Sequence, residues 1–159
     1  KLKFFFKEYN WNLDLLVEAL KLTEDEVRRY GRDGRRTSFL MEIIICKEMK
    51  GTMAPNENYP FDFEDNQQKK LEVRCLTIRG VNFRPSKNTG SGRAYDKKTF
   101  EDKLKLLEGY FVADIRNFPK VATFKILSGW SLSITFSIPL PRETVTNIEG
   151  ALPRKVAII

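Results

Sequence analysis

The sequence predicts a mixed α/β fold (α+β), in which helices flank a sheet of mixed strand direction. Two observations lead to this prediction. Helical patterns fill the first part of the chain, and strand patterns interrupted by one further helix fill the rest. The length of 159 residues suits one domain with a substantial core and is short for two.

Three helical patterns come first. Leucine and valine recur at helical spacing within residues 12–22. Thr23 and Glu26 then have the spacing of a capping box, which predicts a short helix ending at Gly31. A third helix is expected over residues 37–50, where a wide apolar face is followed by a glycine.

Strand patterns dominate the later part. Strands are expected over 59–64, 71–78, 110–115, 122–127 and 130–138, with a helix over 98–107 and a last short helix over 144–150. Phe100, Leu104 and Leu107 are expected to face the core from the helix at 98–107. We expect a single domain made of a helical part (1–36), a catalytic core (37–127) and a C-terminal strand and tail (128–159).

The charge is positive and unevenly distributed. The net charge is +7, from 28 basic and 21 acidic residues, which is enough to attract a polyanion. Basic residues gather in 28–36 and again in 84–105, whereas 54–66 contains acids and no lysine or arginine. A carboxylate pocket flanked by basic segments suits a metal ion that faces phosphates.

The composition excludes several kinds of site. The chain has no histidine and two cysteines, which rules out a histidine base or a Ser-His-Asp triad and leaves few soft ligands for zinc. Cys46 and Cys75 fall in apolar patterns, so we expect buried free thiols in a reducing, cytoplasmic compartment. No apolar run is long enough to cross a membrane, and we expect no membrane partner. Because the chain begins at Lys1, we expect a trimmed product or a piece of a longer protein.

Asp62 and Glu72 are the candidate metal ligands. They lie on two expected neighbouring strands joined by the polar turn 65–68. Alternate side chains of a strand project to one face, so Glu72 and Arg74 point the same way, and Asp62 joins them if the strands pair. Two carboxylates beside a cation can hold Mg²⁺ against a phosphodiester. The alternative, weighed slightly below the metal site, is an edge-strand acid and a salt bridge between Glu72 and Arg74.

These residues resemble the motif of the PD-(D/E)XK nuclease superfamily, to which many type II restriction endonucleases belong. The motif stands here as Pro60-Phe61-Asp62, with one extra residue before the aspartate, and Glu72-Val73-Arg74, with arginine in place of the usual lysine. The order of elements in 37–127 also resembles that family's restriction-endonuclease-like αβββαβ core. The resemblance implies a Mg²⁺-dependent endonuclease of restriction type that cleaves double-stranded DNA, with Asp62, Glu72 and Arg74 as its catalytic residues.

Two further features bear on this resemblance. Glu42 matches the place where some members add a helical acidic metal ligand, although a solvated acid on the helix face is the preferred interpretation. Arginine stays protonated in proteins, so Arg74 supplies charge and hydrogen bonds but cannot act as a base. Either the site works electrostatically with a metal-activated water, or it is weak or inert. Lys69 and Lys70 are candidates to replace the missing lysine.

A basic loop follows the second acidic strand, and it is the expected DNA contact. Its candidate residues are Arg84, Lys87, Asn88, Ser91, Arg93, Lys97 and Lys98. The glycines of this loop allow close backbone approach, and its polar side chains suit phosphates and base edges. It lacks the spacing of a nucleotide-binding P-loop. Because palindromic sites are read by symmetric dimers, we expect a homodimer.

Two other functions stay open. In the first, the chain is a non-catalytic DNA-binding module that uses the basic loop or the helical pair at 15–30, which resembles a helix-turn-helix with Arg28, Arg29 and Arg32 at its end. In the second, it binds RNA or single strands by stacking, although most of its aromatic residues fit core positions better.

Overall fold

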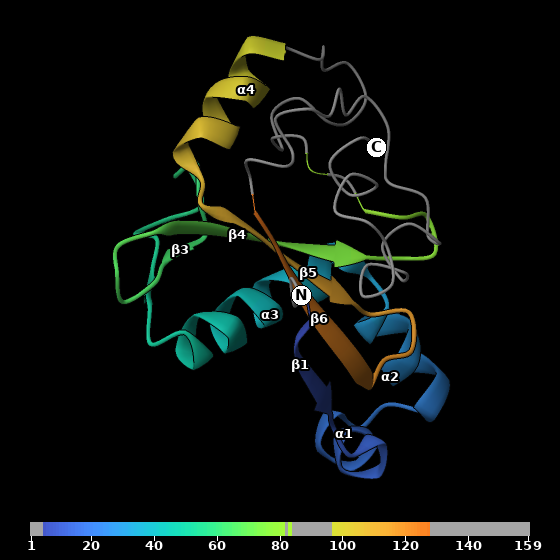
Figure 1. The fold of residues 1–159 in the computed structure, drawn as a ribbon. Coiled ribbons are helices and arrows are strands. Elements are labelled where there is room, and N and C mark those ends of the chain that lie inside the picture. The colour runs from blue at the N-terminus through green and yellow to red at the C-terminus, as the bar shows by residue number, and fades with distance from the viewer. Residues whose placement is uncertain (1–4, 82, 84–96, 128–159) are drawn as a thin grey trace.

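A computed structural model describes residues 5–81, 83 and 97–127, which form a mixed α/β unit of four helices and one six-stranded sheet (Figure 1). This confirms the expected fold class. The strands are β1 (Phe5–Asn10), β2 (Thr52–Met53), β3 (Phe63–Glu64), β4 (Lys70–Leu76), β5 (Gly109–Asp114) and β6 (Lys120–Leu127). The helices are α1 (Leu13–Leu20), α2 (Glu24–Gly31), α3 (Gly34–Glu48) and α4 (Lys97–Leu106).

The sheet runs in the order β1-β6-β5-β4-β3-β2. β4 and β5 are parallel, and every other neighbouring pair is antiparallel. A parallel pair needs a long crossover, and the segment that contains α4 provides it. β4 therefore lies in the interior of the sheet, between the long strand β5 and the very short strand β3.

Both faces of the sheet are covered, and β5 divides the two cores. Tyr110 and Val112 belong to the core on the α4 side, whereas Phe111 and Ala113 belong to the core on the α3 side. The two helices lie on opposite sides of the sheet in Figure 1. α4 and the residue after it bury Phe100, Leu104 and Leu107, as expected. α3 buries Met41, Ile45 and Cys46. A central strand that is apolar on both faces is typical of this kind of packing.

The helix boundaries follow local capping. The capping box at the start of α2 is present: the Thr23 hydroxyl accepts from the Glu26 N–H at 3.3 Å, and the Glu26 carboxylate accepts from the Thr23 N–H at 2.8 Å. α2 ends at Gly31, as expected. α3 begins at Gly34, earlier than the expected residue 37, because the Asp33 side chain accepts from the Arg35 N–H at 3.0 Å and caps the helix.

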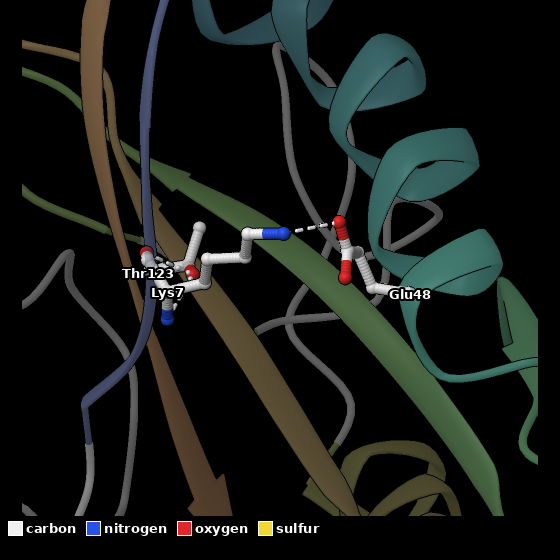
Figure 2. A network of polar contacts seen from close by, with 3 residues as sticks. All are labelled: Lys7, Glu48 and Thr123. Atoms are coloured by element: carbon white, nitrogen blue, oxygen red, sulfur yellow. Dashed lines mark hydrogen bonds and ion pairs between the residues drawn. The ribbon is translucent and has the colours of Figure 1, made fainter.

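Two strands were not expected from the sequence. β2 is too short to carry a periodic pattern, and β1 has a register shift between Phe5 and Lys7 that breaks the apolar alternation. Lys7 fixes β1 in place. The Lys7 N–H donates to the Thr123 hydroxyl at 3.1 Å, and that hydroxyl donates back to the Lys7 carbonyl at 2.6 Å (Figure 2). The Lys7 ammonium lies 2.5 Å from the Glu48 carboxylate of α3.

The strand expected over 59–64 is the main local error. Only Phe63–Glu64 forms a strand, and residues 59–62 form bends that lead into it. Asp62 therefore precedes β3 instead of lying within it. The strand expected over 130–138 and the helix over 144–150 lie outside the described residues, as does most of the polar stretch 80–96.

Candidate functional site

Asp62 is attached to β4 at the point where β3 begins. The pairing of β3 with β4 joins Phe63 to Leu71 and Glu64 to Lys70. Asp62 extends this contact through its own backbone, since its N–H donates to the Leu71 carbonyl at 3.0 Å. Its carboxylate oxygen Oδ2 then accepts from the Val73 N–H at 2.7 Å. The backbone pairing of β3 with β4 thus stops at Phe63 and Leu71. Beyond that point the Asp62 side chain, instead of another β3 backbone group, accepts the hydrogen bond from β4.

A cavity of about 870 Å³ lies between the first half of α3 and the second half of β4. Asp62, Glu72 and Arg74 all line it, together with Glu42 of α3. The structure therefore brings the acids that the sequence singled out into one pocket. Glu42 is half-buried there, so it is not a freely solvated acid of the helix face.

Glu72 is held between two cations. Its Oε1 forms an ion pair with Arg74, which confirms that both side chains lie on the same face of β4. Its Oε2 forms an ion pair with Lys103 of α4. The Glu72 side chain is 5% exposed, and the side chains of Arg74 and Lys103 are 20% and 12% exposed. The salt bridge that the sequence offered as the alternative to a metal site is present.

Sequence reasoning missed Lys103 as a site residue. A signal was nevertheless available, because Lys103 follows Phe100 by one helical turn and directly precedes Leu104, on the apolar face of α4. A lysine on the inward face of a helix needs a buried anion as its partner. Glu72 is that partner.

Lys69 and Lys70, the residues expected to compensate for the missing lysine, make other contacts. The Lys69 ammonium lies 3.2 Å from Glu108 at the surface. The Lys70 ammonium lies 5.3 Å from the centre of the Phe61 ring. Neither side chain lines the cavity.

The carboxylates of Glu42 and Asp62 carry raised pKa values. Burial raises the pKa of Glu42 to about 7, with further contributions from the charges of Asp62 and Glu72. Burial and the charge of Glu72 raise the pKa of Asp62 to about 6, although the Val73 N–H, Arg74 and Lys103 act in the opposite direction. Burial alone would lower the pKa of Arg74, but the surrounding acids, led by Glu72, raise it overall. Burial is thus the first cause of both raised carboxyl pKa values, and the neighbouring acids add to it.

These acids fit a magnesium ion in number and kind. Mg²⁺ takes one or two protein carboxylates and completes its coordination with water and substrate. Glu42 and Asp62 are the candidates for those two because both line the cavity, and a cation bound beside them would stabilise their charged forms. Within the described part of the chain, no group of three or more acidic, cysteine or histidine side chains is arranged to hold a metal ion. Both oxygens of Glu72 are engaged by Arg74 and Lys103.

Cys75 lines the same cavity but is not a nucleophile. Burial raises the pKa of its thiol to about 12, so it stays protonated at neutral pH. Cys46 is a buried free thiol, as expected, whereas the free thiol Cys75 is only partly buried.

Arg84, Lys87, Asn88, Ser91 and Arg93 lie outside the described residues. Lys97 and Lys98 begin α4, and Lys98 is exposed.

The helical pair α1–α2 packs on the core. Leu13, Leu16 and Val17 lie against the α3-side core, to which Val27 belongs. Arg28 donates to the Phe118 carbonyl at 3.3 Å and to the Glu24 carboxylate at 3.0 Å.

No protein-family model matches the chain, no curated protein matches its sequence, and no solved structure matches its fold. Among the described residues, no helix is both long and apolar enough to span a membrane.

Proposed function

We propose that the protein is a Mg²⁺-dependent endonuclease that cleaves phosphodiester bonds of double-stranded DNA. One observation carries this proposal: Glu42 and Asp62, two carboxylates with raised pKa, share a cavity with the cation Arg74, and Lys103 lies against Glu72 of the same cavity. A site for a divalent ion beside positive charge is what phosphodiester hydrolysis needs.

The chain's own residues have separate tasks in this proposal. Asp62 and Glu42 would hold the ion, and Glu72 could join them only when its ion pair with Lys103 opens. Bound Mg²⁺ would polarise a phosphoryl oxygen and make water a better nucleophile. Asp62 is oriented by the Val73 N–H, which fixes one of its oxygens and leaves the other for the cavity.

Arg74, which lines the cavity, would stabilise the charge that develops on the phosphate, and Lys103 would act there through its ion pair with Glu72. Arg74 stays protonated and acts only through its charge and hydrogen bonds. Of these two cations, only Lys103 can also lose a proton, and it comes from a helix instead of the strand that carries Glu72. Glu72 positions both cations, so its role is to hold the positive side of the site together.

The order of elements supports the finer fold expectation. In the described part of residues 34–114, the elements α3, β2, β3, β4, α4 and β5 come in the order helix, three strands, helix, strand. This is the αβββαβ order that the resemblance to PD-(D/E)XK nucleases implies. We include a restriction-endonuclease-like core in the proposal on this basis.

Cleavage of supercoiled plasmid DNA tests the proposal. With Mg²⁺ the protein should linearise or fragment the plasmid, and with EDTA it should not. Asp62→Asn should abolish cutting while DNA binding survives, because the substitution removes a ligand charge but keeps an oxygen for the Val73 N–H. Glu64→Gln is the matched control, since Glu64 lies two positions away on β3 but does not line the cavity. Undiminished cutting by Asp62→Asn would refute the assignment.

Discrete fragments would also support the homodimer that we include in the proposal, because symmetric sites are cut by two copies. Sedimentation of the protein with and without a cleavable duplex measures this directly. Binding without any cutting would favour the non-catalytic DNA-binding module instead.

A further inference from the structure

The mouth of the cavity carries three arginines from two parts of the chain. Arg32 is the C-cap of α2, Arg35 lies in the first turn of α3, and Arg79 lies in the turn that follows β4. The Arg35 side chain is 93% exposed, and Arg32 and Arg79 are also exposed. These side chains therefore reach solvent at the opening, whereas Glu72 and Arg74 are covered.

Among the described residues that line this opening, Asp33 is the acid beside the arginines, and it is already engaged. One of its oxygens accepts from the Arg35 N–H and caps α3, and the other lies 3.8 Å from the Arg35 guanidinium. The charges of the cavity are thus separated, with acids at its base and arginines at its mouth. A phosphodiester that approached the acids alone would be repelled, and the mouth supplies the attraction needed to bring it in.

The turn that carries Arg79, residues 77–80, also presents an apolar side chain to the same opening. Ile78 is 76% exposed and lines the cavity. The turn is held closed by the Thr77 N–H donating to the Gly80 carbonyl at 3.1 Å and by the Gly80 N–H donating to the Thr77 carbonyl at 2.9 Å. An exposed aliphatic side chain next to a cation matches a nucleotide unit, which offers an apolar base face beside a phosphate. A small phosphate compound would make no use of it.

We infer that a DNA strand crosses this mouth, with its phosphates on Arg32, Arg35 and Arg79 and one base against Ile78. This inference rests on the proposed function, since it takes DNA as the substrate. It places the contact surface on the α2–α3 connection and on the turn after β4. The sequence had named Arg32 at the end of the helical pair but not Arg35 or Arg79, and it had otherwise placed the DNA contact on the segment 84–98.

Binding of a fluorescently labelled duplex in EDTA, where no cutting occurs, tests the arginines. The variant Arg32→Gln/Arg35→Gln should bind more weakly. The slope of log affinity against log salt should fall by about 1.8, because each phosphate that is no longer neutralised reduces it by about 0.9. The control Arg29→Gln/Arg36→Gln removes the same charge from exposed residues of α2 and α3 that do not line the cavity. It should leave the slope within about 0.5 of the wild type. Equal losses in both variants would overturn the inference, because they would show an effect of net charge or of the helical pair.

Ile78→Ala tests the base contact separately. A duplex that carries 2-aminopurine near the binding site should show enhanced fluorescence with the wild type if a base is unstacked, and the enhancement should fall by at least half with Ile78→Ala. The salt slope should stay unchanged, because no charge is removed. An identical enhancement with both proteins would refute the role of Ile78.

The outcomes for the inference and for the proposed function can be told apart. If Asp62→Asn loses Mg²⁺-dependent cutting but Arg32→Gln/Arg35→Gln binds like the wild type, the inference is wrong and the nuclease stands. If no variant or wild type cuts DNA but the arginine substitutions weaken binding as described, the surface stands and the nuclease is wrong. Thermal melts of each variant exclude misfolding as the cause.

Discussion

Lys103 of α4 forms an ion pair with Oε2 of Glu72 on β4, in a position where the two side chains are only 12% and 5% exposed. This contact joins the crossover helix to the sheet, and it does so beside the cavity that also holds Asp62. A buried ion pair is costly to break from one side only, because the remaining charge stays desolvated. The contact therefore links the stability of the fold to the geometry of the proposed site.

Lys103→Met should destabilise the protein and abolish cleavage. Removing one partner of a buried ion pair costs about 3–5 kcal/mol of unfolding free energy. Lys103→Met should cost less than this, because Glu72 keeps Arg74 as a second partner. Urea unfolding measures this change. Lys105→Met on the exposed side of α4 is the control and should change stability by less than about 0.5 kcal/mol. Equal stability of the two variants would contradict the described ion pair.

Glu72→Gln and Asp62→Asn should differ sharply in stability. Glu72 neutralises two poorly exposed cations, so its substitution should cost about 3–5 kcal/mol. Asp62 has a raised pKa because its charged form is disfavoured, so Asp62→Asn should be neutral or stabilising at pH 7. Thermal melts of both variants at pH 7 check this order. A larger loss for Asp62→Asn would mean that the charge of Asp62 stabilises the fold.

The stability of the metal-free protein should fall as the pH rises from about 4 to about 7. Both Asp62 and Glu42 have higher pKa values in the folded protein, about 6 and about 7, than their ordinary values of 3.8 and 4.5. In this range the folded state binds protons that the unfolded state has already lost, so the unfolding free energy decreases with pH and levels off above it. For Asp62 the loss at pH 7 is on the order of 2–3 kcal/mol.

Urea unfolding at several pH values measures this slope. Asp62→Asn should flatten it, and Asp25→Asn, at an exposed acid of α2, should not. Mg²⁺ at pH 7 should raise the unfolding free energy of the wild type, since a ligand that binds only the folded state stabilises it. A stability curve that rises between pH 4 and pH 7 and keeps the same slope in Asp62→Asn would contradict the electrostatics of the pocket.

The alternation of side chains along a strand, together with the polar turn at residues 65–68, was enough to predict that Asp62, Glu72 and Arg74 lie close together. Glu72 and Arg74 lie on one face of β4 because they are two positions apart, and a polar turn returns the chain so that Asp62 meets the same strand. The sequence could not show that β3 would begin only at Phe63, because bends and strands share the same apolar residues there. Because β3 includes no residue before Phe63, Asp62 contacts Val73 through its side chain and not through strand pairing.

Other features depend on partners that are distant in the sequence. β1 was missed because its partner β6 lies more than 100 residues later in the chain and because the register shift after Phe5 removes the alternating pattern. The place of Lys103 opposite Glu72 depends on the crossover between two parallel strands, which no local pattern encodes. The start of α2 was predicted correctly because Thr23 acts on its own neighbours, whereas the cap by Asp33 was missed and α3 begins three residues earlier than expected.

Gly31→Ala should destabilise the fold. A methyl group at this position would overlap the ring of Phe118, which packs directly on the end of α2. Such overpacking costs about 1–3 kcal/mol because the ring must move within a dense core. Gly34→Ala is the control: its added methyl would lie 3.2 Å from the Thr77 side chain, which can yield slightly. Thermal melts compare the two, and an equally stable Gly31→Ala protein would contradict this packing.

Because β1 pairs with β6, the sheet cannot finish folding until the β6 segment has been synthesised. β1 is synthesised long before its partner strand β6 (Lys120–Leu127), so its backbone hydrogen-bonding groups must wait in water or in temporary contacts. Closing contacts between such distant segments slows folding. A chain interrupted before Lys120 would leave the edge of β5 uncovered, and that edge could pair with another nascent chain.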